Sequence, residues 1–379
     1  RGAAAAAAAR GEGSKAMSMR IQTICKHALK DLDMMLLMAG GSEYGHEAHS
    51  LINFFQDQLL KVEAGGDDVL LATGSKQLKT AQHAEEQPKQ TSGEWKHQVF
   101  SNPNLQLNAN IGFEIERINC PALHDFLKLY MESAVPVILT DVMKNWPALE
   151  LWEDMKYLKS KARGRTVPIE TGNNYLDPST GNKLMAMDDF ISNILEEEGY
   201  KEEEKTANSN QNSAQVGIVH GSSKIHYLAQ HQLFDQIPDL NKDILTPDYC
   251  ALVPDAEEED WNGQVVRQAW LGPPGTISPL HTDPYHNLLA QVVGSKFIRL
   301  YAPKWNQNMY PMEGKMNNNS SVDMTNPDHL RFPMFAEAQY MQGVLNKGEM
   351  LYIPPRWWHY ITSLETSFSV SFWWGKKHT

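Results

Sequence analysis

The chain has 379 residues, of which 41% are hydrophobic and 21% charged, and 34 Lys and Arg against 46 Asp and Glu give it a formal net charge of -12. The length predicts two to three domains of about 150 residues, and the apolar content excludes wholesale disorder. The negative charge argues against binding of nucleic acid or of an anionic membrane surface through bulk charge, because both need a basic face.

Cysteines are sparse, and no long apolar segment is present. Cys25, Cys120 and Cys250 form no CxxC motif, which excludes a disulfide scaffold and a cysteine-based zinc finger and favours a reducing compartment. No stretch approaches the roughly 20 apolar residues that a membrane span needs. We therefore expect a soluble intracellular protein.

The first 110 residues divide into three predicted segments. Residues 1–15, which include seven consecutive alanines, are of low complexity and predicted to be disordered. Residues 16–72 are predicted to be helical, because apolar side chains recur at steps of three and four over 21–39 and again over 48–62. A glycine pair follows each run, as is typical of a helix end. The polar residues 73–110 are predicted to be a linker.

Residues 111–379 form the next predicted region. A helix is expected from Pro121, where proline suits the first helical position. Buried strands are expected at Val135–Thr140 and Arg165–Glu170. An insertion near 196–215, rich in Glu, Asn and Ser, is predicted to be disordered. A second acidic run, 255–260, is predicted to be a solvated loop.

The stretch Val265–Trp374 is rich in β-branched and aromatic residues between Gly, Pro and Asn turns. Several short strands in such a length predict an antiparallel sandwich or barrel. The predicted fold class is therefore mainly β with flanking helices, plus the helical N-terminal region.

One short motif in this stretch has the residue types of a metal site. His281 and Asp283 flank one residue of a predicted strand, and strand residues two apart point to the same face. With a distant third ligand they would form a 2-His-1-carboxylate triad, the usual Fe(II) oxygenase arrangement. Taken alone, the motif has poor specificity and favours a surface strand end.

Lys296 has an unusual setting. Val293-Gly294-Ser295-Lys296 predicts a hairpin, because glycine suits the first position of a type II′ turn. In that hairpin Lys296 points to the side of His281 and lies between apolar residues. A cation there needs an anion, which a carboxylate ligand would supply. The alternative is a lysine at a turn that reaches solvent.

The third metal ligand is expected on a later strand. Met350–Ile353 is predicted to be a strand, two prolines end it, and an aromatic corner follows that contains His359. The competing histidines are His286, which has the wrong strand parity, His329 in a polar loop, and His378.

Residues from about 115 to 375 resemble the Jumonji-C (JmjC) oxygenases, which depend on Fe(II) and 2-oxoglutarate. The resemblance is carried by His281-Thr-Asp283, Asn287, Lys296 fifteen residues after the first histidine, and the segment from Gly348 to His359. The segments Tyr227–Phe234 and Ser367–Trp374, together with Trp270, resemble members that carry the JmjC domain alone. The insertion near 196–215 departs from the expected pattern.

This resemblance implies a double-stranded β-helix, a jelly roll of the cupin-like kind, over residues 111–379. It implies that His281, Asp283 and His359 hold the iron at one open end. Lys296 would bind the distal carboxylate of 2-oxoglutarate, with help from Tyr227 and Ser278. Asn287 would lie near this cosubstrate, and O2 would be the third cofactor.

The resemblance leaves three functions open. The first is hydroxylation of a protein arginyl side chain, with release of succinate and CO2. The second is histone methyl-lysine demethylation, or endopeptidase action on methylated histone tails, in a chromatin regulator. The third is a non-catalytic chromatin or partner-binding scaffold. The expected partner is a basic, arginine-containing protein, with histones and ribosomal or chromatin-associated proteins as candidates, and the expected location is the nucleus and cytoplasm.

Three residues are candidates for the substrate pocket. A guanidinium that enters a pocket needs a carboxylate or an aromatic face. Glu170 ends a predicted strand before the turn at Gly172 and is the candidate carboxylate, while Trp270 and Trp373 are candidate walls. The alternatives are a solvated strand end for Glu170 and core positions for the tryptophans.

Overall fold

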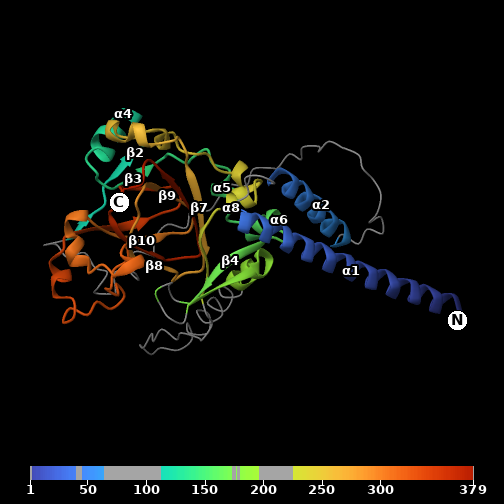
Figure 1. The fold of residues 1–379 in the computed structure, drawn as a ribbon. Helices are drawn as coiled ribbons and strands as arrows, with labels where there is room; N and C mark the ends of the chain where they lie inside the picture. The colour runs from blue at the N-terminus through green and yellow to red at the C-terminus, as the bar shows by residue number, and fades with distance from the viewer. Residues whose placement is uncertain are drawn as a thin grey trace, which may run out of the picture. The chain divides into compact units, whose positions relative to one another are not determined.

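The computed structural model describes residues 2–39, 45–63, 112–172, 176, 180–195 and 225–378. The chain divides into two compact units, Arg1–Leu105 and Gln106–Thr379, each of which is described by itself (Figure 1). The linker predicted at 73–110 and the insertion near 196–215 lie outside the described residues. None of the helices in the described ranges is long and apolar enough to cross a lipid bilayer.

The first unit contains the helices α1 (Gly2–Ala39) and α2 (Gly45–Glu63), which confirms the predicted helical N-terminal region. Their apolar stripes share one core, formed by Cys25, Leu29, Leu36, Ala48, Ile52 and Leu59. The helix α1 also runs through residues 2–15, for which we expected disorder. Alanine has the highest intrinsic helix propensity, so a run of it readily extends a helix that packing has already formed.

The second unit is built from two β-sheets. The smaller sheet has five strands in the order β1 (Gly112–Glu114), β11 (Tyr340–Leu345), β10 (Lys296–Tyr301), β13 (Trp358–Ser363), β8 (Ile277–Thr282). The larger has nine, in the order β2 (Arg117–Asn119), β3 (Val137–Thr140), β12 (Met350–Ile353), β9 (His286–Val293), β14 (Ser367–Trp374), β7 (Val266–Gly272), β6 (His226–His231), β4 (Thr166–Thr171), β5 (Gly181–Ala186). From β7 onward the chain changes sheet at every connection except the one from β10 to β11, which are paired in the smaller sheet, and this is the predicted double-stranded β-helix.

Both faces of the central strand β9 are buried, and this explains its largely apolar sequence. Leu289 shares a core with residues of both sheets, such as Leu351 of the larger sheet and Ile298 of the smaller one, in the space between the sheets. Leu288 and Ala290, on the opposite face, belong to a larger core that includes helical residues. Every second residue of β9 therefore faces the space between the sheets and can reach a site there.

Short helices accompany this larger core. The α- and π-helical segments are α4 (Leu123–Phe126), η1 (Leu127–Met131), α5 (Ala148–Leu151), α6 (Met155–Lys161), residues 187–195 and α8 (Leu233–Gln236). The 3-10 segments are η2 (Leu240–Lys242), η3 (Asp248–Ala251), η4 (Asp255–Asp260), η5 (Pro303–Met309), η6 (Gly314–Met316) and η7 (Pro333–Glu337). The helix expected from Pro121 is α4 with η1, and the strands expected at 135–140, 165–170 and 350–353 are β3, β4 and β12.

The predicted hairpin between Val293 and Lys296 is wrong. Val293 ends β9 in the larger sheet, Lys296 begins β10 in the smaller one, and the two strands pair with other neighbours. Gly294 does turn the chain, with a φ of 70°. A Cβ there would lie 2.2 Å from the carbonyl oxygen of Thr366, so the turn is packed against the strand connection before β14 and carries the chain from one sheet to the other.

The acidic run 255–260 differs in part from its prediction. It forms the 3-10 helix η4, and its other residues are exposed as expected of a solvated segment, but Glu257 is only 6% exposed. The physical reason is that two histidines face this carboxylate, at 3.2 Å (His286) and 3.1 Å (His378).

Candidate functional site

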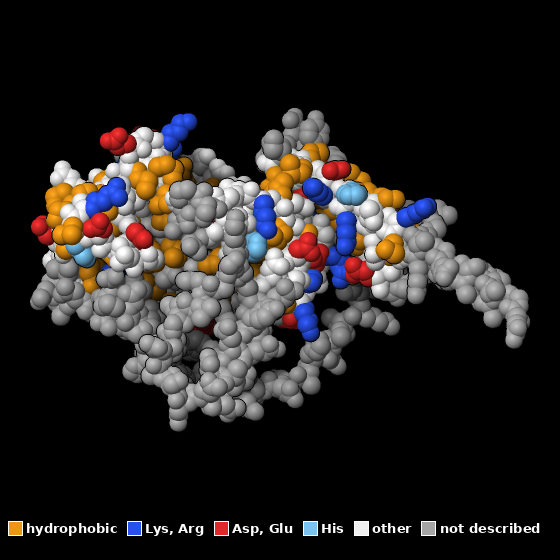
Figure 2. Space-filling model, turned by 90° about the horizontal axis from the view of Figure 1, so that it is seen from below, with side chains coloured by type: hydrophobic (Ala, Val, Ile, Leu, Met, Phe, Trp, Pro, Cys, Tyr) orange, Lys and Arg blue, Asp and Glu red, His pale blue; other side chains and the backbone are white. Residues whose placement is uncertain are grey.

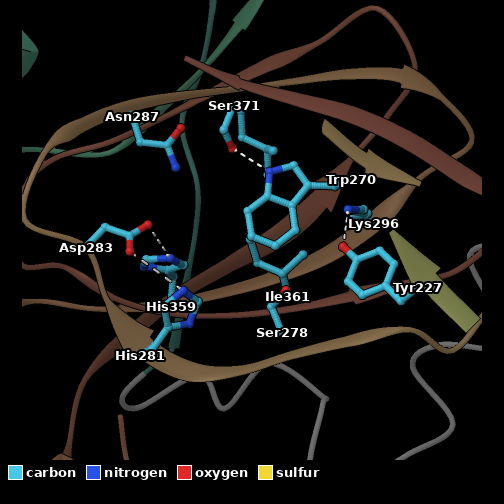
Figure 3. A pocket seen from close by; sticks show the side chains of 11 residues that line it. Tyr227, Trp270, Ser278, His281, Asp283, Asn287, Lys296, His359, Ile361 and Ser371 are labelled. Atoms are coloured by element: carbon cyan, nitrogen blue, oxygen red, sulfur yellow. Dashed lines mark hydrogen bonds and ion pairs between the residues drawn. The ribbon is translucent and has the colours of Figure 1, made fainter. Parts of the chain in front are cut away.

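The three predicted metal ligands converge at one end of the sandwich. His281 is on β8 and His359 on β13, and the two residues are direct partners in the strand register. Asp283 follows β8. Its Oδ2 lies 3.5 Å from Nε2 of His359, and its Oδ1 lies 4.0 Å from Nε2 of His281. One ligand atom from each of the three residues lies within 4.8 Å of the other two. Figure 3 shows Asp283 pointing toward both imidazoles.

The two imidazoles present the same nitrogen to the centre of this cluster. Nδ1 of His281 lies 2.6 Å from the carbonyl oxygen of Pro279, and Nδ1 of His359 lies 2.9 Å from that of Trp357. A carbonyl oxygen only accepts, so each Nδ1 carries the proton and each Nε2 keeps its lone pair. Such a backbone partner fixes the tautomer and ring orientation of a metal-binding histidine.

The electrostatics of the cluster suit a divalent cation. Burial and then the charge of His359 lower the pKa of His281 to about 4, so its imidazole is neutral near pH 7. Burial alone would raise the pKa of Asp283, but the two histidines beside it lower it. Two imidazoles and a carboxylate on one side, with the other side open to a pocket, are the ligand set of non-heme Fe(II) oxygenases.

An inner pocket begins at this cluster and extends to Lys296, and it is also lined by Tyr227, Trp270, Ser278 and Asn287. Lys296 is 2% exposed, and its Nζ lies 3.3 Å from Oη of Tyr227. Burial lowers the pKa of Lys296 to about 7, and no carboxylate of the described residues forms an ion pair with it. A buried ammonium without an anion is costly, so the position fits a carboxylate-bearing ligand such as 2-oxoglutarate.

Asn287 has an unsatisfied polar atom in the same pocket. Its Oδ1 is buried and forms no hydrogen bond, although buried side-chain polar atoms usually have a partner. Figure 3 shows its side chain on the same side of the pocket as Asp283. The residues predicted for cosubstrate binding, Tyr227, Ser278, Asn287 and Lys296, therefore surround one space.

An outer pocket of about 410 Å³ opens from the inner one and brings together the three predicted substrate residues, Glu170, Trp270 and Trp373. Its lining includes His281 and Asp283, so a side chain bound there reaches the metal ligands. Trp270 donates from Nε1 to Oγ of Ser371 at 3.0 Å. Burial raises the pKa of Glu170, which is on β4 opposite Tyr227 in the strand register.

Several lining residues were missed by sequence reasoning. Ser371 and Ile361 line the inner pocket, and each lies two residues from a candidate, Trp373 and His359, so the period-two rule for strands could have found them. Lys377 lines the outer pocket. It follows the last strand, and no pattern in the sequence signalled it.

The chain is similar to known proteins over most of its length. Residues 123–379 match the family model described as a cupin-like domain. Lysine-specific demethylase 8 of Xenopus tropicalis is 38% identical over 303 residues, which are 80% of this chain and 61% of that protein. The protein of the same name from Danio rerio is 37% identical, over 93% of this chain and 75% of that protein. Jumonji C domain-containing protein 5 of Drosophila melanogaster is 41% identical, over 69% of this chain and 60% of that protein.

Proposed function

The chain belongs to the cupin-like JmjC oxygenase family, and from this premise we propose that it is an Fe(II)- and 2-oxoglutarate-dependent dioxygenase that hydroxylates an arginyl side chain of a protein. One observation carries the proposal: Glu170 and the metal ligands His281 and Asp283 line the same outer pocket.

His281, Asp283 and His359 would hold Fe(II), and the ammonium of Lys296 with the hydroxyl of Tyr227 would bind a carboxylate of 2-oxoglutarate. When bound, these groups with O2 supply the oxidising chemistry, and 2-oxoglutarate leaves as succinate and CO2. The contribution of this chain is orientation and exclusion of side reactions. Lys296 fixes one end of the cosubstrate, Asn287 offers a hydrogen-bonding group beside the metal ligands, and Trp270 stands between the lysine and the metal side of the pocket (Figure 3).

The arginine assignment rests on charge and shape in the outer pocket. A carboxylate accepts two parallel hydrogen bonds from a guanidinium, and an indole face attracts a cation. Glu170 and Trp270 would supply these contacts. Lys377 lines the same pocket and would repel a cation close to it, so we place the guanidinium toward Glu170.

A second candidate is demethylation of a methylated lysine. Two of the relatives are named lysine-specific demethylase 8. An N-methylated ammonium would be held by aromatic faces, and Trp270 and Trp373 line the outer pocket. Endopeptidase action on methylated histone tails would use the same recognition of a methylated ammonium. A non-catalytic scaffold is disfavoured, because it would need neither the three converging ligands nor a buried lysine.

The partner that we propose is a basic protein, such as a histone or a ribosomal or chromatin-associated protein, met in the nucleus or cytoplasm. The net charge of -12 supports it, because complementary charge raises the encounter rate. On the face seen in Figure 2, the described basic and acidic side chains lie interspersed, so the charge that matters is expected at the pocket rather than spread over that face.

Product mass tests the proposal. The iron-loaded protein is incubated with 2-oxoglutarate and either an arginine-containing histone peptide or its trimethyl-lysine counterpart. Gain of one oxygen atom on the arginine peptide is the expected result. Loss of a CH2 unit from the methylated peptide would assign demethylation, and two fragments would assign proteolysis. His359→Ala is the control that should abolish every product while its circular dichroism stays that of the wild type.

A further inference from the structure

A second group of metal-binding side chains lies outside the iron site. Glu257, His286 and His378 have ligand atoms that all lie within 4.8 Å of one another; we call them the second cluster. Oε2 of Glu257 is 3.2 Å from Nε2 of His286, and Oε1 is 3.1 Å from Nε2 of His378. Burial would raise the pKa of Glu257, but the two histidines outweigh it and lower it to about 2, so the carboxylate is ionised.

These spacings fit a metal coordination sphere. Nitrogen and oxygen ligands bind Zn2+ at about 2.0–2.1 Å in a tetrahedral array, which places neighbouring ligand atoms about 3.3 Å apart. The contact between His378 and Glu257 does not have the geometry of a hydrogen bond, because the buried Nε2 of His378 has no hydrogen-bond partner. His286 does form a hydrogen bond with Oε2 of Glu257, at 3.2 Å, and a bound ion would replace it.

His286 is oriented as a metal-binding histidine. Its Nδ1 lies 2.8 Å from Oη of Tyr352, a hydroxyl that can either donate or accept. A metal ion that takes Nε2 would therefore leave Nδ1 free to donate to Tyr352, as the other ring nitrogen of a ligating histidine almost always does to a neighbouring acceptor. Its ring stacks between those of Tyr352 and Trp374, with centroids 6.0 and 5.4 Å away. Nε2 is therefore held toward Glu257.

His378 is brought to the cluster by a fixed turn of the 375–378 segment. Gly375 has a φ of 83°, and a Cβ on it would lie 2.7 Å from Cδ2 of His286. The backbone N–H of His378 donates to the carbonyl oxygen of Pro284 at 2.8 Å, and Nζ of Lys376 lies 3.5 Å from a carboxylate oxygen of Asp260. The segment thus runs close against the cluster.

We propose that Glu257, His286 and His378 form a second metal site that takes Zn2+, with a water molecule as the fourth ligand. The site is separate from the iron site, because His286 and Asn287 are neighbours on β9 and adjacent strand residues point to opposite faces. Its role is structural. It fixes the 375–378 segment, whose Lys377 lines the outer pocket.

Zinc stoichiometry tests this proposal without any activity measurement. The full chain is stripped of metal, dialysed against micromolar Zn2+ and analysed for bound metal. Wild type should hold two equivalents and His378→Gln one. His329→Gln, at a histidine outside both clusters, should keep two. In a His281→Ala background, in which the iron site has lost a ligand, one tightly held equivalent should remain and His378→Gln should remove it.

Binding of Co2+ gives a second measurement of the second cluster, in a protein whose iron site is not mutated. The tetrahedral second cluster should add a strong visible absorption band that is lost in His378→Gln. Because His378 is at the surface, with its side chain 28% exposed, this variant should fold. If His378→Gln binds as much Zn2+ as wild type in both backgrounds, or if the His281→Ala protein holds none, the second cluster is an ion-pair network and the proposal is overturned.

Discussion

Lys296 and Tyr227 meet across the inner pocket from the metal ligands, where Nζ of the lysine lies 3.3 Å from Oη of the tyrosine (Figure 3). The lysine comes from the smaller sheet and the tyrosine from the larger one. Neither forms an ion pair with another described residue. This arrangement leaves the charge of Lys296 to be balanced by a ligand.

We therefore predict that Lys296→Ala weakens 2-oxoglutarate binding strongly. Hydrogen bonds to charged groups contribute about 1.5–3 kcal/mol, so the dissociation constant should rise about 10- to 150-fold. Lys296→Arg should be only partly tolerated, because a planar guanidinium and a compact ammonium are not interchangeable in a closed pocket. Calorimetric titration of the metal-loaded protein measures both. Lys304→Ala, at an exposed lysine, is the control, and an unchanged affinity in Lys296→Ala would assign the cosubstrate elsewhere.

The same lysine predicts a pH dependence. Burial lowers the pKa of Lys296 to about 7 in the unliganded protein, and only the protonated form binds a carboxylate. The affinity for 2-oxoglutarate should therefore fall as pH rises through 7 toward 9, by up to about tenfold per pH unit. In Lys296→Arg the slope should vanish, because arginine stays charged.

The stability of the unliganded protein should change with pH in the direction opposite to the affinity for 2-oxoglutarate. A free lysine has a pKa of about 10.4, so between about pH 7 and pH 10 the unfolded chain binds a proton that the folded chain lacks. The free energy of unfolding of the unliganded wild type should thus rise with pH in that window, relative to Lys296→Met. Urea denaturation at several pH values checks this, and parallel curves for the two proteins would contradict the low pKa.

The next prediction concerns the corner between β9 and β10. Gly294 and Gly314 have nearly the same φ, 70° and 71°, but only Gly294 is crowded, with a Cβ position 2.2 Å from the oxygen of Thr366. Left-handed backbone costs an alanine about 1–2 kcal/mol. Gly314→Ala should lose about that much stability in urea denaturation, and Gly294→Ala clearly more. Equal losses would mean that Thr366 moves away freely.

Much of the fold and site could be predicted because it depends on local pattern. The period of two placed His281 and Asp283 on one face, and the strand Met350–Ile353 was visible from its ends. The strands that pair with β9 could not be predicted, because a turn at Gly294 is compatible with a hairpin within one sheet and with a passage between two sheets. The burial of Glu257 was also hidden, since its partners His286 and His378 lie 29 and 121 positions later in the sequence.

The last prediction separates the two candidate substrates. Glu170 is the carboxylate that we propose for the guanidinium. Burial raises its pKa, and the same shielding from water strengthens its attraction to a cation. Glu170→Gln keeps the shape of the side chain but removes its charge. It should lower kcat/KM for an arginine peptide by about 10- to 150-fold, the equivalent of a hydrogen bond to a charged group. Turnover of 2-oxoglutarate without peptide should be unchanged, because Glu170 is not a metal ligand.

The matched control is Glu114→Gln, at an exposed glutamate that ends the strand β1, and it should leave both rates as in wild type. A peptide with lysine in place of the target arginine should fail, because it lacks the planar pair of donors that a carboxylate binds. Mass spectrometry of the peptides and measurement of released succinate give the two rates independently. If Glu170→Gln turns over the arginine peptide as fast as wild type does, or if wild type oxidises the lysine peptide equally well, the arginine assignment fails and demethylation becomes the better candidate.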